Sequence, residues 1–133
     1  MQNQSQEIGV IGETIAADYL KKNGYQILAR NFKTKWGELD IVAQKNKVII
    51  FVEVKTLHFA SLVQGRPEKS DFAPEDEITF HKAQQLRKMA QIYLSANRLP
   101  LDIAQQIDIL AIELAKNSQI ANIRHIQNAI EDY

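Results

Sequence analysis

The chain has 133 residues, a length that suits a single domain, and its 45% hydrophobic and 24% charged residues are typical of a globular protein. It contains no cysteine, which excludes disulfides, thiolate catalysis and cysteine-ligated zinc. Sixteen basic residues balance sixteen acidic ones, but residues 21–55 hold eight basic and three acidic side chains. This asymmetry is consistent with one basic face, or with uneven sampling of an ordinary solvated surface.

The N-terminal residues 1–6 are polar and uncharged, and we expect them to be disordered. They lack the basic start and apolar stretch of a signal peptide. The longest apolar run, Val48 to Val52, is too short to cross a bilayer. We therefore expect a cytoplasmic protein with no membrane partner.

Hydrophobic periodicity predicts a mixed α/β domain. Apolar residues at helical spacing indicate a helix over residues 7–23, which Gly24 would end in a left-handed conformation. Three strands should follow, the last two joined by a turn at Lys45-Asn46. Their expected ranges are 25–32, 36–43 and 47–55. In the second of these strands, alternation places Trp36, Glu38, Asp40 and Val42 on one face.

The second half of the chain begins with a long irregular segment. Residues 57–78 contain Gly65, Pro67 and Pro74 and show no clear period, so we expect a long loop. A second helix over residues 79–97 should follow, with a strand inside 103–114 and a weaker one at 120–126. The whole chain, 1–133, is then one domain with an αβββαβ core, in which helices flank a mixed central sheet.

The chemistry-bearing residues lie on the second and third predicted strands. If these strands form a hairpin, Asp40 converges with Glu53 and Lys55 at one end of the sheet. Carboxylate oxygens suit Mg²⁺ or Mn²⁺, and a neighbouring lysine suits phosphodiester hydrolysis. The alternative is that Glu53 and Lys55 only mark the point where a buried strand reaches solvent.

A series of short motifs carries a resemblance to a known family. In chain order these are Gly12-Glu13, Tyr19-Leu20, Gly24-Tyr25, Asn31, the string from Gly37 to Ala43 and the string from Phe51 to Thr56. Together they resemble the YraN-like uncharacterised bacterial family, whose pattern is similar to the PD-(D/E)xK endonuclease superfamily. The match runs from about Ile8 to Leu114. The resemblance implies a restriction-endonuclease-like or Holliday-junction-resolvase-like fold.

The resemblance also implies roles for individual residues. Asp40 and Glu53 would bind the metal, Glu13 would complete its ligand set, and Lys55 would orient water or stabilise charge. Glu38, on the strand face of Asp40, would be a supporting ligand or a lysine partner. Lys82 or Gln85 would lie near the substrate phosphate, although a solvated helix face is the favoured role for both.

Two features depart from the family pattern. The segment from Glu68 to Glu77 is long and acidic, which would oppose binding of a polyanion. No arginine precedes Asp108 where one is expected, so a buried, paired aspartate is the favoured role for that residue. The aromatic residues Tyr25, Phe32 and Trp36 can stack on bases, but in strands such residues more often belong to the core.

Two functions follow as hypotheses. The first is a Mg²⁺- or Mn²⁺-dependent endonuclease that hydrolyses structured or branched DNA. The second is a non-catalytic module on a nuclease fold that binds nucleic acid or another partner. Resolvase-like proteins of this fold often dimerise, and the sequence leaves both a monomer and a homodimer open.

Overall fold

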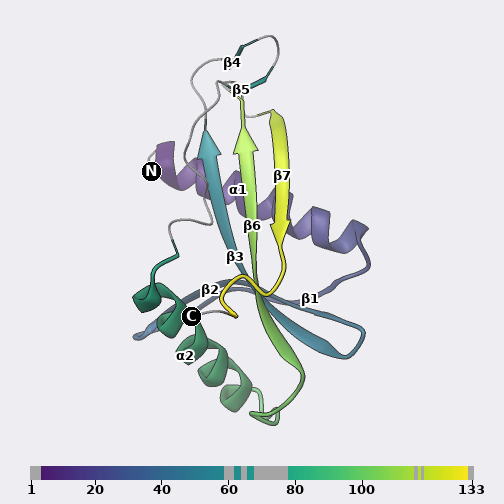
Figure 1. Ribbon diagram of the computed structural model, residues 1–133, viewed down its shortest axis with the longest axis vertical. Coiled ribbons are helices and arrows are strands. Elements are labelled where there is room, and N and C mark those ends of the chain that lie inside the picture. The colour runs from purple at the N-terminus through teal and green to yellow at the C-terminus, as the bar shows by residue number, and fades with distance from the viewer. Residues whose placement is uncertain are drawn as a thin grey trace.

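The computed structural model describes residues 4–58, 62–63, 66–67, 78–115, 117 and 119–131. A five-stranded sheet in the order β1-β2-β3-β6-β7 forms its centre, and a short two-stranded pair, β4-β5, stands apart from it (Figure 1). The elements are α1 (Gln4–Lys22), β1 (Gln26–Thr34), β2 (Gly37–Lys45), β3 (Val48–His58), β4 (Leu62–Val63), β5 (Arg66–Pro67), α2 (Phe80–Ala96), β6 (Gln105–Leu114) and β7 (Ile120–Ile126).

The sheet is mixed. β1, β2 and β3 form an antiparallel meander, β3 pairs with β6 in parallel, and β7 closes the far edge antiparallel to β6. The parallel pair requires a crossover, which α2 provides. The αβββαβ core expected from the sequence is therefore confirmed, with β7 added at the edge.

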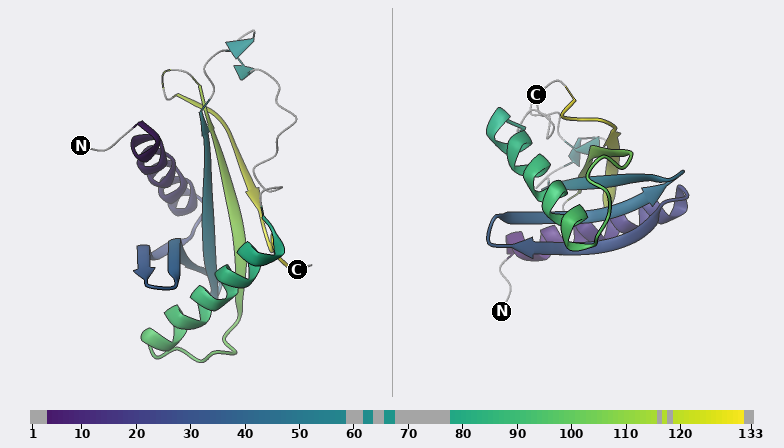
Figure 2. Two further views of the ribbon diagram at one scale, coloured as in Figure 1. Left: turned by 90° about the vertical axis from the view of Figure 1, so that its left-hand side faces the viewer. Right: turned by 90° about the horizontal axis from the view of Figure 1, so that it is seen from below.

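The two helices cover opposite faces of the sheet (Figure 2). Alternation along β3 explains this arrangement, because successive side chains of a strand point to opposite faces. Ile50 and Val52 pack into the core with Leu20 of α1, whereas Ile49 and Phe51 join the core that contains α2. Since both faces are covered, β3 is apolar on both sides until it reaches Glu53.

Local signals account for the ends of the helices. Gly24 has φ +88°, and the N–H of Tyr25 donates to the carbonyl of Leu20 at 2.9 Å, so α1 ends where the sequence predicts. The Thr79 side chain accepts a hydrogen bond from the N–H of Lys82 at 3.1 Å and caps α2.

Two boundaries differ from the expectations. The helix α1 begins at Gln4, inside the segment expected to be disordered; residues 1–3 lie outside the described part of the chain. Because Lys45 pairs with Val48, the turn after β2 consists of Asn46 and Lys47. Both residues have positive φ. The turn therefore lies one residue later than expected. Its positive φ angles match the twist of the two strands that it joins.

The long loop expected at residues 57–78 falls mostly outside the described residues. At its start, β3 continues through His58, and Leu62–Val63 pairs with Arg66–Pro67. At its end, the buried side chain of Ile78 precedes α2.

Candidate metal centre and its surroundings

The candidate site lies where β2 parts from β3. The last paired residues are Ile41 and Val52, and the β1–β2 hairpin then turns away from β3, β6 and β7 (Figure 2). Leu39 packs against α2 and Ile41 packs against α1, although the two are separated by only one residue. The strand therefore twists at Asp40, and its carboxylate lies at the opening between the strands.

A hydrogen bond holds Asp40 in this opening. Continued pairing would bring Val54 opposite Leu39, but the N–H of Val54 donates instead to Oδ2 of Asp40 at 2.8 Å. Val54 stands between Glu53 and Lys55. The hydrogen bond from Val54 therefore holds Glu53-Val54-Lys55 next to Asp40, as the predicted hairpin requires.

Three carboxylates converge around Asp40. One oxygen from each of Glu13, Glu38 and Asp40 lies within 4.8 Å of the others, a spacing that suits shared coordination of one cation. Glu13 comes from α1, and the other two come from β2. Glu13, which the family resemblance names as a metal ligand, thus lies beside Asp40, together with Glu38, which was expected in a supporting role.

Close packing of α1 on β3 places Glu13. A Cβ atom on the preceding residue, Gly12, would lie 1.8 Å from Oγ1 of Thr56, so only glycine allows the helix to approach β3 this closely. In the pair Gly12-Glu13, the glycine allows close packing of the helix on β3, and this packing brings the Glu13 carboxylate to the opening in the sheet.

Residues from β1 surround Glu13. Asn31 donates a side-chain hydrogen bond to Glu13, and the positive charges of Arg30 and Lys33 also act on it. Asn31 has φ +54°, a left-handed conformation that asparagine adopts more readily than most residues. Asn31 belongs to the family motif, but strand alternation gives no indication of its left-handed backbone.

The site carries an excess of negative charge. Burial, together with the charges of Glu53, Glu13 and Glu38, raises the pKa of Asp40 to about 7 despite the hydrogen bond from Val54. Burial and the charge of Glu38 likewise raise the pKa of Glu13. A cation among these oxygens would relieve the repulsion.

Glu53 lies beside this cluster, in a cavity of about 470 Å³ that Glu38 and Asp40 also line. Its side chain is only 9% exposed, and Oε1 lies 3.4 Å from Nζ of Lys82 on α2. Lys82 and Gln85 line the same cavity. Glu53 is not within the 4.8 Å group; it adjoins that group and is paired with a lysine.

The strand-face prediction for β2 is partly wrong. Glu38 and Asp40 do approach each other, but Val42 packs into the core beneath α2 and Trp36 lies in the turn that precedes β2. The cause is the twist at Asp40, which interrupts the alternation on which that prediction depended. Lys55, two residues beyond Glu53 on β3, is half-buried.

Comparisons with known proteins identify the family. The sequence pattern of "Uncharacterised protein family UPF0102" matches residues 12–112. The chain belongs to the UPF0102 family. A UPF0102 protein of Clostridium botulinum (strain Loch Maree / Type A3) is 35% identical over 127 residues, 96% of each chain. One from Caldanaerobacter subterraneus subsp. tengcongensis is 37% identical over 123 residues, 92% of this chain and 93% of the other.

Among solved structures, SfsA of Pyrococcus furiosus in complex with Ca²⁺ is similar at a TM-score of 0.36 and 14% identity. The alignment covers 92% of this UPF0102 chain and 63% of SfsA, a little under two thirds of its length. In the described part of the UPF0102 chain, no helix is both long and apolar enough to cross a membrane.

A second buried polar cluster lies away from the carboxylates. Asp108 of β6 is fully buried, and Oδ2 lies 2.8 Å from Nε2 of His125 on β7. Its Oδ1 accepts hydrogen bonds from the Gln106 side chain at 2.9 Å and from the N–H of Asn128 at 3.1 Å. The expected buried, paired aspartate is confirmed. Its partner His125 was missed, because 17 residues of separation carry no pairing signal.

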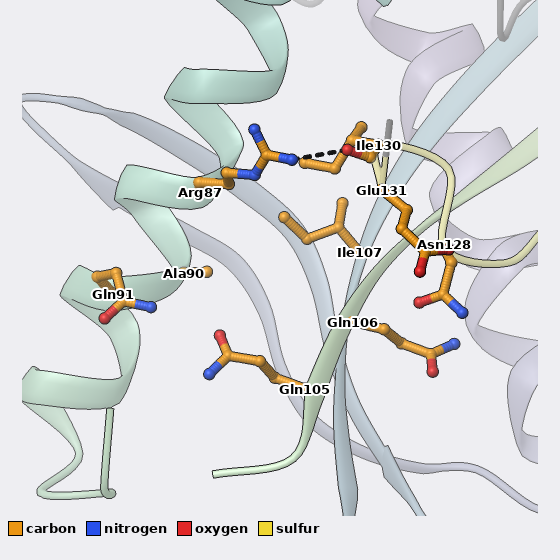
Figure 3. A pocket seen from close by; sticks show the side chains of 9 residues that line it. All are labelled: Arg87, Ala90, Gln91, Gln105, Gln106, Ile107, Asn128, Ile130 and Glu131. Atoms are coloured by element: carbon orange, nitrogen blue, oxygen red, sulfur yellow. Dashed lines mark hydrogen bonds between the residues drawn. The ribbon is translucent and has the colours of Figure 1, made fainter. Parts of the chain in front are cut away.

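A second cavity, of about 440 Å³, lies between α2, β6 and the segment after β7 (Figure 3). Amide side chains dominate its polar lining, and Nη2 of Arg87 donates to the carbonyl of Ile130 at 2.7 Å. Among the described residues that line it, Glu131 alone supplies a carboxylate. One carboxylate among amides is a poor cation site, in contrast to the three carboxylates grouped at Asp40.

Proposed function

We propose that this protein is a divalent-metal-dependent nuclease that hydrolyses phosphodiester bonds, with structured or branched DNA as its substrate. The observation that carries the proposal is the group of three carboxylate oxygens from Glu13, Glu38 and Asp40 within 4.8 Å. Such a group is costly in a partly buried site unless a cation balances it.

The donor set fits Mg²⁺ or Mn²⁺. These hard cations prefer carboxylate oxygens and take few protein ligands, because they keep several waters. Asp40 and Glu13 would hold the ion, with Glu38 or the neighbouring Glu53 as a further ligand. When bound, the ion supplies an activated water and neutralises charge on the phosphate.

Other residues of the chain would position the metal ligands and stabilise charge on the phosphate. The hydrogen bond from Val54 fixes the Asp40 carboxylate, and Asn31 orients Glu13. Lys55, joined to this arrangement through Val54, would orient the attacking water or stabilise the charge that develops on the phosphate oxygens. Lys82 holds Glu53 and stands in the same cavity, where its ammonium group can contact the phosphate.

The first test needs no assumption about the substrate. Mn²⁺ is titrated into the isotope-labelled protein, and paramagnetic broadening of NMR signals is compared between the wild type and the double variant Glu13→Gln, Asp40→Asn. We expect broadening around Glu13, Glu38 and Asp40 in the wild type and its loss in the double variant. A matched control, Glu7→Gln with Asp102→Asn, changes two exposed carboxylates and should behave as the wild type does.

Cleavage is then assayed on single-stranded, duplex, flap and four-way-junction DNA with Mg²⁺ or Mn²⁺. Cleavage that the double variant loses and the control variant retains is the expected result. If the double variant and the wild type respond alike to millimolar Mn²⁺, the nuclease proposal fails. Binding that falls steeply with salt and ignores divalent ions would then indicate a non-catalytic nucleic-acid-binding module.

A further inference from the structure

The only tryptophan of the chain, Trp36, is 51% exposed at the tip of the β1–β2 hairpin. The other two aromatic residues considered for base stacking are partly buried: Phe32 packs edge-on against Tyr93, and Tyr25 lies beside His125. Trp36 thus departs from the core role that is usual for a strand aromatic. An exposed indole ring offers a large, rigid apolar face to a binding partner.

Two hydrogen bonds position the backbone at Trp36. Thr34 pairs with Gly37, so Lys35 and Trp36 form a two-residue turn. The N–H of Trp36 donates to Oγ1 of Thr34 at 3.0 Å, and Nε2 of Gln85 donates to the carbonyl of Trp36 at 3.5 Å. The ring is therefore presented from a turn that is anchored to α2.

Two ammonium groups lie against the indole ring. Nζ of Lys88 is 3.7 Å from its centroid, and Nζ of Lys35 is 5.0 Å away. Lys35 also lines the cavity that contains Asp40 and Glu53, so Trp36 stands at the rim of the candidate metal centre. Two ammonium groups over an exposed aromatic ring suit a nucleotide, because its phosphates can draw the ammonium groups off the ring while its base stacks on the face that they leave.

We propose that Trp36, Lys35 and Lys88 form a stacking platform for an unpaired nucleobase next to the phosphodiester bond that is cleaved. This inference rests on the proposed nuclease function and narrows its substrate to nucleic acid with at least one unpaired nucleotide at the cut. In a continuous duplex both faces of each base are covered by its neighbours, and only base edges are accessible from the grooves. The platform therefore favours single strands, flaps and junctions over blunt duplex.

Because Trp36 is the only tryptophan, its fluorescence reports stacking directly. A single-stranded oligodeoxynucleotide is titrated into the wild type in Mg²⁺ and, separately, in EDTA, and a blunt duplex of the same sequence and length serves as comparison. We expect saturable quenching by the single strand at concentrations where the duplex quenches much less. Equal quenching by both, or none by the single strand while anisotropy shows that it binds, overturns the proposal.

Variants provide an independent measurement. By anisotropy of a labelled single strand, Trp36→Ala should weaken binding about tenfold, the usual effect of removing one stacked base. Trp36→Phe, which keeps an aromatic face, should recover most of the loss. The control Ile120→Ala removes an exposed apolar side chain from the opposite edge of the sheet and should bind as the wild type does.

The two proposals fail in different ways. If the single strand quenches Trp36 and Trp36→Ala weakens binding, but there is neither cleavage nor Mn²⁺ broadening, the stacking platform is supported and the nuclease proposal is rejected. If cleavage requires Asp40 but the Trp36→Ala variant binds and cuts single strand and duplex as the wild type does, the platform proposal is rejected and the nuclease proposal stands.

Discussion

Oδ2 of Asp40 accepts a hydrogen bond from the backbone N–H of Val54 at 2.8 Å, where the carbonyl of a paired strand would otherwise be expected. This single bond joins the two sequence strings that carry the candidate chemistry. The bond also gives the N–H of Val54 a hydrogen-bond partner at the place where β2 leaves β3 and no strand carbonyl is available. The geometry of the site and the integrity of the sheet therefore depend on the same carboxylate.

The raised pKa of Asp40 predicts a pH-dependent stability in EDTA. The pKa rises from 3.8 to about 7, so between these values the folded chain holds more protons than the unfolded chain, and stability falls as pH increases. Asp40→Asn removes this penalty and keeps an oxygen for Val54. Its Tm advantage over the wild type should grow from pH 4 to pH 7 and then level off.

Thermal melts across that range check this prediction. Asp102→Asn changes an exposed aspartate, and its Tm difference from the wild type should not vary with pH. A Tm advantage of Asp40→Asn that is the same at pH 4 and pH 8 would contradict the raised pKa. Added Mn²⁺ should raise the wild-type Tm more at pH 8 than at pH 5, because protons compete with the metal for the carboxylates.

Gly12→Ala should disrupt the contact that positions Glu13. The added Cβ would overlap Thr56, and overpacking of this kind costs about 1–3 kcal/mol of stability. Gly9→Ala is a matched control on the same helix, since a Cβ there has nothing within 4 Å. Urea unfolding should show a loss for Gly12→Ala and no loss for Gly9→Ala, and Mn²⁺ affinity should fall only in the former.

Relief of the strain provides a further check. In the double variant Gly12→Ala, Thr56→Ala, both Oγ1 and the methyl group of Thr56 are absent, and part of the lost stability should return. Full wild-type stability of Gly12→Ala alone would show that α1 does not need to approach β3 this closely.

Lys55→Ala should separate catalysis from binding. If Lys55 stabilises charge in the transition state, its removal lowers the cleavage rate about a hundredfold or more and leaves affinity for the same DNA nearly unchanged. Single-turnover cleavage and anisotropy measure the two effects. Lys22→Ala, at an exposed lysine of α1, is the control. Parallel loss of affinity and cleavage in Lys55→Ala would indicate a binding or structural role instead.

His125→Ala should destabilise the fold without changing the metal centre. The variant removes the partner that lies 2.8 Å from the fully buried carboxylate of Asp108, a loss of about 1.5–3 kcal/mol for a charged hydrogen bond. His81→Ala, at an exposed position of α2, should change stability by less than about 0.5 kcal/mol. Urea unfolding and Mn²⁺ titration test both parts, and reduced Mn²⁺ affinity in His125→Ala would link the two regions.

The sequence by itself determined the order of the elements and the pairing of the central strands. Apolar periodicity located both helices, and alternation located the hairpin that brings Asp40 toward Glu53, since these signals are local and depend on backbone geometry alone. The ordered family motifs added Glu13, which no local pattern connects to a strand 27 residues away.

Only the tertiary structure decided how these residues meet. The twist of β2 at Asp40 placed Glu38 in the carboxylate group and left Glu53 beside it, paired with Lys82. The pairing of Thr34 with Gly37 placed Trp36 in an exposed turn, whereas strand alternation had assigned it to the face of Asp40. A strand's departure from its neighbour depends on packing against both helices at once, and that balance is absent from any single stretch of sequence.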